Sequence, residues 1–127
     1  MRTLALVREL PHSFAALSLR SDATKAINQN RALEQHSSYT RLLKNILGER
    51  NVIEVEPMHD MPDSCFVEDA VVVLRNKPHA IGMRMGAESR VDEAMSVWNT
   101  LSKVGVTVSK SSHETSLRKA LTKPQQP

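Results

Sequence analysis

Three carboxylates gather at the start of the most strand-like segment of the sequence. The stretch MPDSCFVEDAVVVL (61–74) places Asp63, Glu68 and Asp69 against a run made mostly of Val. An ionised carboxylate beside Val is costly unless it is paired, and a guanidinium is its natural partner because its fork donates two parallel hydrogen bonds. That guanidinium would belong to an arginine of this chain or to a ligand that carries the same group. Acids at the start of a strand are also commonly solvated, and the pattern alone leaves that alternative open.

Arg90 is the second candidate for chemistry. It follows Ser89, the expected cap of a helix, with Asp92 in the capping-box position. A cation in the first turn of a helix is disfavoured by the helix dipole, so we expect an anion nearby. If this helix runs beside strand 66–74, Arg90 lies close to the acids. Acids for a cation and an arginine for a carboxylate would together recognise a zwitterion of the arginine type, although Arg90 as a plain surface residue is the simpler interpretation.

Cys65 invites two further hypotheses. With His59 it would form a thiolate–imidazole pair, and with His59 and Asp63 it would supply three metal ligands. The metal hypothesis lacks the fourth ligand and the paired spacing of a zinc site. A single cysteine is more often a small buried apolar residue. We therefore expect no metal and no other cofactor.

Composition sets the broad class. The chain has 127 residues, enough for one domain. Hydrophobic residues make up 40% and aromatic residues 3%, so the core must be aliphatic. The single cysteine excludes an intramolecular disulfide, which favours a reducing compartment, and we expect the cytoplasm. No apolar run approaches the roughly 20 residues of a membrane span, so no membrane partner is expected.

The net charge of +3 is localised. Residues 110–127 hold four basic side chains and one acidic side chain, whereas the remaining residues balance at 13 basic and 13 acidic. Nucleic-acid binding would require clustered Lys and Arg with stacking aromatics. Because neither is present on the body of the chain, no nucleic-acid partner is expected.

The apolar pattern predicts strands that alternate with amphipathic helices, which is typical of an α/β fold. The pattern of residues 1–60 recurs loosely over 66–110, as two copies of a strand–helix–strand unit. In a regular strand, Glu68 and Asp69 would point to opposite faces and could share a pocket only if the strand were distorted there. We expect strands at 3–10, 51–57, 66–76, 79–85 and 106–110, and helices at 21–48, capped by Ser21 or Asp22 and ended by Gly48, and at 89–104. Residues 111–127 have little apolar periodicity, and we expect a folded part over 1–110 followed by a loose tail.

The segment 61–74 resembles a family signature. MPDSCFVEDAVVVL is similar to the LPDxxFVEDxAVV element of the dimethylarginine dimethylaminohydrolases, members of the pentein (amidinotransferase-like) superfamily. The resemblance extends to LVRELPHSF, to the first helix region with its QH pair, and to AIGMRMGAESRVDE, and so covers roughly residues 3–109. It implies a five-bladed α/β propeller with a buried polar site, hydrolysis of methylated arginines to citrulline and a methylamine, and a place in arginine and nitric-oxide metabolism.

The resemblance also implies roles for individual residues. Leu19 matches the family's lid-side leucine, and Asp63, Glu68, Asp69 and Arg90 match its substrate-binding residues. Asp69 and Glu68 would hold the cationic end or the amine of the substrate, and Arg90 its carboxylate. The partner implied is thus a small molecule, a methylated arginine.

The sequence departs from the family pattern after Lys110. The family's LDGGDV stretch, its catalytic histidine and its nucleophilic cysteine have no counterpart in the 127 residues, and Cys65 matches a non-catalytic position. We expect about two of the five blades, a truncated product that is inactive alone. The alternatives are a non-catalytic methylarginine-binding or interaction module, with self-association through exposed blade edges, and a remnant without function.

Overall fold

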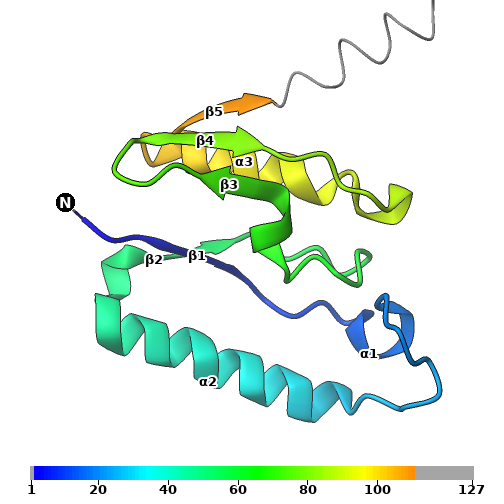
Figure 1. Ribbon diagram of the computed structural model, residues 1–127. Coiled ribbons are helices and arrows are strands. Elements are labelled where there is room, and N and C mark those ends of the chain that lie inside the picture. The colour runs from blue at the N-terminus through cyan, green and yellow to red at the C-terminus, as the bar shows by residue number, and fades with distance from the viewer. Residues whose placement is uncertain (1, 111–127) are drawn as a thin grey trace, which may run out of the picture.

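The computed structural model describes residues 2–110, which form two open sheets with helices against them (Figure 1). The first sheet pairs β1 (Ala5–Arg8) with β2 (Val52–Val55) in parallel, with Ala5 opposite Val52. The connection between them runs through the short helix α1 (Phe14–Leu17), the long helix α2 (Gln29–Leu47) and the 3₁₀ helix η1 (Glu49–Asn51). Parallel strands need such a crossover because their ends lie far apart.

The second sheet has β4 (His79–Gly82) at its centre. β3 (Val71–Val73) pairs with it in an antiparallel sense, and β5 (Thr107–Lys110) in parallel. The 3₁₀ helix η3 (Glu88–Arg90) and α3 (Glu93–Lys103) connect β4 to β5. The predicted α/β class is thus confirmed, and each half contains a parallel strand pair joined through a helix. Within residues 2–110 neither sheet closes on itself.

The first long helix begins later than the sequence predicts. α2 starts at Gln29, and the side chain of Asn28 caps it by accepting from the Arg31 N–H at 2.9 Å. Ser21 and Asp22 were the wrong caps, since the Asp22 carboxylate instead accepts from the Thr24 N–H at 3.0 Å and so favours a local turn. The end at Gly48 is confirmed, where the backbone adopts a positive φ of 89°.

The expected strand at 66–76 is largely wrong. Residues Val67–Ala70 form the 3₁₀ helix η2, and only Val71–Val73 are strand. The second long helix also starts later than expected, at Glu93, because η3 takes up residues 88–90. Ser89 therefore caps nothing, and Asp92 precedes α3 without a side-chain capping bond. The expected tail at 111–127 lies outside the described residues.

The core is aliphatic, as predicted, and lies between α3 and the second sheet. Trp98 of α3 covers its edge and donates from its ring N–H to the Ala70 carbonyl at 2.8 Å. This bond ties α3 to the end of η2, the turn that carries Glu68 and Asp69. Among residues 2–110 no helix has both the length and the apolar character needed to cross a bilayer. The buried members of the cluster are Ala70, Ala80, Met85, Ala94, Val97 and Leu101.

Candidate functional site

The 3₁₀ helix η2 changes where the acids point. Its backbone bonds run from the Phe66 N–H to the Asp63 carbonyl (3.1 Å) and from the Asp69 N–H to the Phe66 carbonyl (3.2 Å). A 3₁₀ helix turns by about 120° per residue, whereas a strand turns by about 180°. Glu68 and Asp69 therefore do not alternate between two faces of a sheet, and both are exposed. The distortion that a shared site requires is present.

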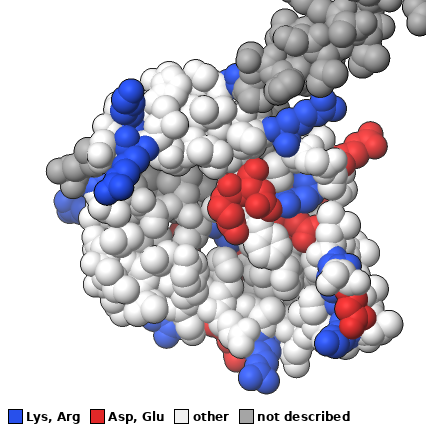
Figure 2. All heavy atoms as spheres, viewed as in Figure 1, with Lys and Arg blue, Asp and Glu red and all other residues white. Residues whose placement is uncertain are grey.

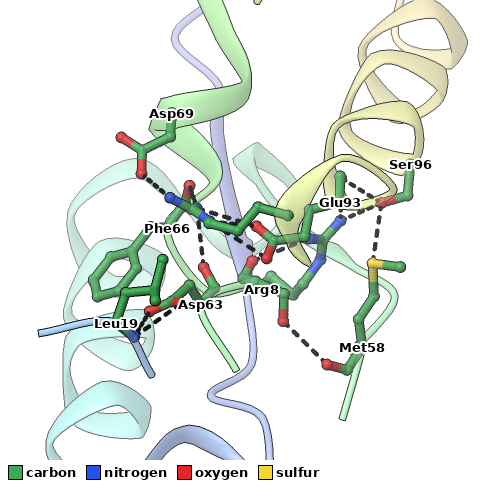
Figure 3. A network of polar contacts seen from close by, with 10 residues as sticks. Arg8, Leu19, Met58, Asp63, Phe66, Asp69, Glu93 and Ser96 are labelled. Carbon is green, nitrogen blue, oxygen red and sulfur yellow. Dashed lines mark hydrogen bonds and ion pairs between the residues drawn. The ribbon is translucent and has the colours of Figure 1, made fainter. Parts of the chain in front are cut away.

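Asp63 is the buried acid of the site, with only 3% of its surface exposed. Its two carboxylate oxygens accept from the backbone N–H of Leu19, at 3.2 and 3.1 Å. The structure thus brings together Leu19 and Asp63, which lie 44 residues apart (Figure 3). Within residues 2–110 this N–H is the one hydrogen-bond donor to the carboxylate, which has capacity for several more.

Arg90 lies beside Asp69, as expected, although it ends η3 rather than standing in the first turn of a helix beside a strand. Its Nη1 donates to the Asp69 carboxylate at 2.7 Å. Its Nε and Nη2 lie 3.1 and 3.0 Å from Oε2 of Glu93, and Nη2 also donates to the Asp63 carbonyl at 3.2 Å. Burial alone would lower the pKa of Arg90, but the hydrogen bonds that it donates to Asp69 and Glu93 outweigh burial and raise that pKa.

Glu93 and Arg8 belong to the same network, and sequence reasoning missed both. The Glu93 side chain is 3% exposed, and burial raises its carboxyl pKa even though Arg90 acts in the opposite direction. Arg8 is 1% exposed, and burial lowers its pKa against the attraction of Glu93. Its guanidinium donates to the carbonyls of Ser64 (3.0 Å) and Glu93 (3.4 Å) and to the Ser96 hydroxyl (Figure 3). A signal for Arg8 was available, since it is the one cation in an otherwise apolar strand.

Cys65 does not form a thiolate–imidazole pair. Burial raises the pKa of its thiol to about 11, so the thiol is protonated at neutral pH. The ring of His59 stacks on that of His12, with centroids 3.8 Å apart, and its Nδ1 accepts from the His12 N–H. In the part of the chain that the structure describes, no group of three acidic, histidine or cysteine side chains is placed to hold a metal ion.

A large apolar groove lies beside the acids. It has a volume of about 1230 Å³, and residues of β1, α2, η2 and α3 line it, among them Leu6, His36, Glu68 and Val97. On the face drawn in Figure 2, acidic and basic side chains are interspersed, without a broad basic area. Glu68, which is exposed and lines the groove, therefore lies at its rim.

Comparison with known proteins identifies the family. No family model matches the chain. A dimethylarginine dimethylaminohydrolase from Streptomyces coelicolor is 38% identical over 104 residues, which are 82% of this chain and 39% of that protein. A cysteine-to-serine variant of the Pseudomonas aeruginosa enzyme, solved in complex with citrulline, superimposes with a TM-score of 0.72 at 30% identity, over 87% of this chain and 42% of that one. The chain belongs to the dimethylarginine dimethylaminohydrolase family, in the pentein superfamily.

The resemblance that the FVED element carries is thereby confirmed. The match to AgrE, solved with L-arginine, has a TM-score of 0.73 over 89% of this chain and 16% of that one, at 22% identity, and shows the shared fold. This dimethylarginine dimethylaminohydrolase family member spans about two-fifths of the length of the relatives that carry the family's name.

Proposed function

We propose that the site around η2 binds a methylated arginine and is the substrate-binding part of an amidine hydrolase. The observation that carries this proposal is Asp63. A carboxylate that is 3% exposed and has a single backbone N–H as donor is poorly compensated. A guanidinium offers it the missing charge and two parallel donors. The relative solved with citrulline supports a ligand of the arginine type.

The other residues of the site are assigned to the remaining charged groups of the ligand. Asp69 and Glu68 offer charge to the cationic end or the amine, and Arg90 offers charge to the carboxylate. Asp69 and Arg90 are paired with each other, but 48% of the Asp69 side chain is exposed. Such a pair is worth about 1 kcal/mol or less. A zwitterionic ligand can replace this ion pair at little cost, because its cation binds Asp69 and its carboxylate binds Arg90. A simple cation or anion would compensate only one of the two side chains.

We also propose that the 127 residues bind without turnover. The Cys65 thiol, with a pKa raised to about 11, is a poor nucleophile at neutral pH, and the described residues hold no histidine paired with it. Matches over 39% and 42% of two relatives agree with about two blades of a five-bladed propeller. The free Cys65 thiol agrees with a reducing compartment such as the cytoplasm.

Calorimetric titration of the 127-residue chain with asymmetric dimethylarginine tests the proposal. We expect binding that Asp69→Asn and Arg90→Met each weaken about ten-fold, equivalent to one lost charge-assisted hydrogen bond. Asp60→Asn, which removes an exposed carboxylate from the preceding loop, is the matched control and should bind as the parent chain does. Absence of binding, or equal binding by the Asp69 and Asp60 variants, would refute the binding role. Release of citrulline would refute the proposed inactivity.

The groove favours a second candidate, an interaction module. Apolar side chains including Leu6, Phe66 and Val97 line its 1230 Å³, and Tyr39 on its wall is 54% exposed. Exposed apolar surface of this extent commonly marks a protein contact, and the open sheet edges add unpaired backbone groups. Sedimentation velocity at increasing concentration should then show association, which a strictly monomeric profile would exclude.

A further inference from the structure

Glu93 is an acidic residue with a buried side chain, which is uncommon. It lies in the first turn of α3, yet its side chain is 3% exposed and points inward to the network rather than to solvent (Figure 3). A buried carboxylate is costly unless cations and hydrogen bonds compensate it. Here Arg90 binds its side chain, and Arg8 binds its main-chain carbonyl at 3.4 Å. Two arginines from distant parts of the chain thus meet at one acid.

The Glu93 carboxylate contacts two nitrogens along one edge of the Arg90 guanidinium. Nε and Nη2 of Arg90 lie 3.1 and 3.0 Å from Oε2 of Glu93. Nη2 is further held by the carbonyls of Asp63 (3.2 Å) and Phe66 (3.5 Å). The remaining nitrogen, Nη1, donates to the carboxylate of Asp69, whose side chain is 48% exposed, at 2.7 Å. Since a guanidinium is planar, two bonds along one edge fix the direction of the remaining nitrogen.

Arg8 connects the two segments of the chain that carry Asp63 and Glu93. Its guanidinium joins the carbonyl of Ser64, next to Asp63, to the carbonyl of Glu93 at the start of α3. One side chain from β1 therefore links the segment that carries the buried acid Asp63 to the start of α3, which carries Glu93. Any ligand that contacts both Asp63 and Arg90 meets a pre-set spacing between them.

We propose that Glu93 is a positioning residue that aims Nη1 of Arg90 at the carboxylate of the bound amino acid. This rests on the proposed function, because it assigns Arg90 to the ligand carboxylate. Glu93 itself touches no ligand. Its removal leaves Arg90 charged and still in contact with Asp69 and the Asp63 carbonyl, but without the acceptor that fixes its Nε. We therefore expect the effect to be confined to ligands that carry the carboxylate.

Two ligands separate positioning from general damage to the site. The first is asymmetric dimethylarginine, and the second is the corresponding amine that lacks the α-carboxylate. We expect Glu93→Gln to weaken binding of the amino acid about ten-fold and of the amine less than two-fold. Asp92→Asn, which changes the adjacent exposed acid, is the control and should change neither. Equal losses for the two ligands, or no loss for the amino acid, would overturn the proposal.

A measurement without ligand keeps this test separate from that of the proposed function. In the parent chain, the Arg90 Nε–H should exchange with water at least ten-fold more slowly than that of the exposed Arg84. Glu93→Gln, whose neutral amide oxygen is a weaker acceptor than the carboxylate, should reduce this protection, and Asp92→Asn should retain it. If the parent chain binds neither ligand, the proposed function fails, while slow exchange still shows that Glu93 orients Arg90. Fast exchange in the parent chain overturns the positioning role even if Glu93→Gln does not fold.

Discussion

Replacing Gly82 by Ala should destabilise the turn that carries the acids. A Cβ at Gly82 would lie 2.8 Å from Cε2 and 3.0 Å from Cζ2 of Trp98. Ordinary carbon contacts are about 3.5–4.0 Å, so the ring must retreat by roughly 1 Å. The same ring donates to the Ala70 carbonyl at 2.8 Å, and Ala70 follows Asp69 at the end of η2. The ring cannot retreat without straining that bond.

The expected loss of stability is about 2 kcal/mol. Overpacking a well-filled site costs about 1–3 kcal/mol, and a weakened hydrogen bond adds about 1 kcal/mol. The gain from a less flexible unfolded chain offsets about 0.4–1 kcal/mol of this cost. For a chain of this length, 2 kcal/mol corresponds to a fall in Tm of about 8 °C.

Thermal and urea unfolding followed by tryptophan fluorescence measure the effect directly, because Trp98 is the sole tryptophan of the sequence. The emission maximum should move as the ring shifts. Gly86→Ala is the matched control, since a Cβ there meets nothing within 4 Å, and its stability should stay within about 0.5 kcal/mol of the parent. If the variants at Gly82 and Gly86 are equally stable, the close packing of Trp98 on β4 is wrong.

Two further changes test the local environments that the structure assigns. Because burial raises the Cys65 pKa from its ordinary value of 9.0 to about 11, the native state favours the neutral thiol, and this stability is present below pH 9 and lost as the pH rises to about 11. After allowance for the partial exposure of Cys65, we expect the free energy of unfolding to fall by about 1 kcal/mol over this pH range. The rate at which the Cys65 thiol is alkylated should still rise above pH 9. An alkylation rate that levels off near pH 8, or an equal loss of stability in Cys65→Ser over the same range, would contradict this. Asn28→Ala should lower the free energy of unfolding in urea by about 1 kcal/mol, because it removes the cap of α2. Ser21→Ala should lower it by less than about 0.5 kcal/mol. The reverse order would favour the helix start at Ser21 or Asp22 that the sequence predicts.

The helices and most strands could be predicted from apolar periodicity because their packing repeats along the chain. The start of α2 could not, since Asp22 and Asn28 are both good capping residues and only the local turn at Asp22 decides between them. The 3₁₀ turn at η2 escaped for a related reason. The run from Phe66 to Leu74 has the composition of a strand, and periodicity cannot reveal a tertiary bond such as that from Trp98 to Ala70.

The candidate site was partly accessible from the sequence. Arg90 could be placed near Asp69 because an arginine beside a helix start needs an anion, and the structure pairs them at 2.7 Å. Glu93 was missed because an acid in the first turn of a helix already has a satisfactory explanation in the helix dipole. Glu93 is buried partly by Arg8, which lies 85 residues away in the sequence. Such a contact leaves no signal in the residues next to Glu93.

The distribution of charge explains why acids precede the Val-rich strand. If every carboxylate were matched by an arginine of the chain, the cluster would serve stability alone. Arg90 compensates Glu93 and Asp69, while Arg8 contacts main-chain carbonyls and one hydroxyl. Asp63 has one backbone N–H as its donor, and Glu68 lies exposed at the rim of the groove. Among the described residues the negative charge around η2 is therefore only partly neutralised, and under the proposed function the guanidinium of a ligand, rather than of the protein, compensates the remainder.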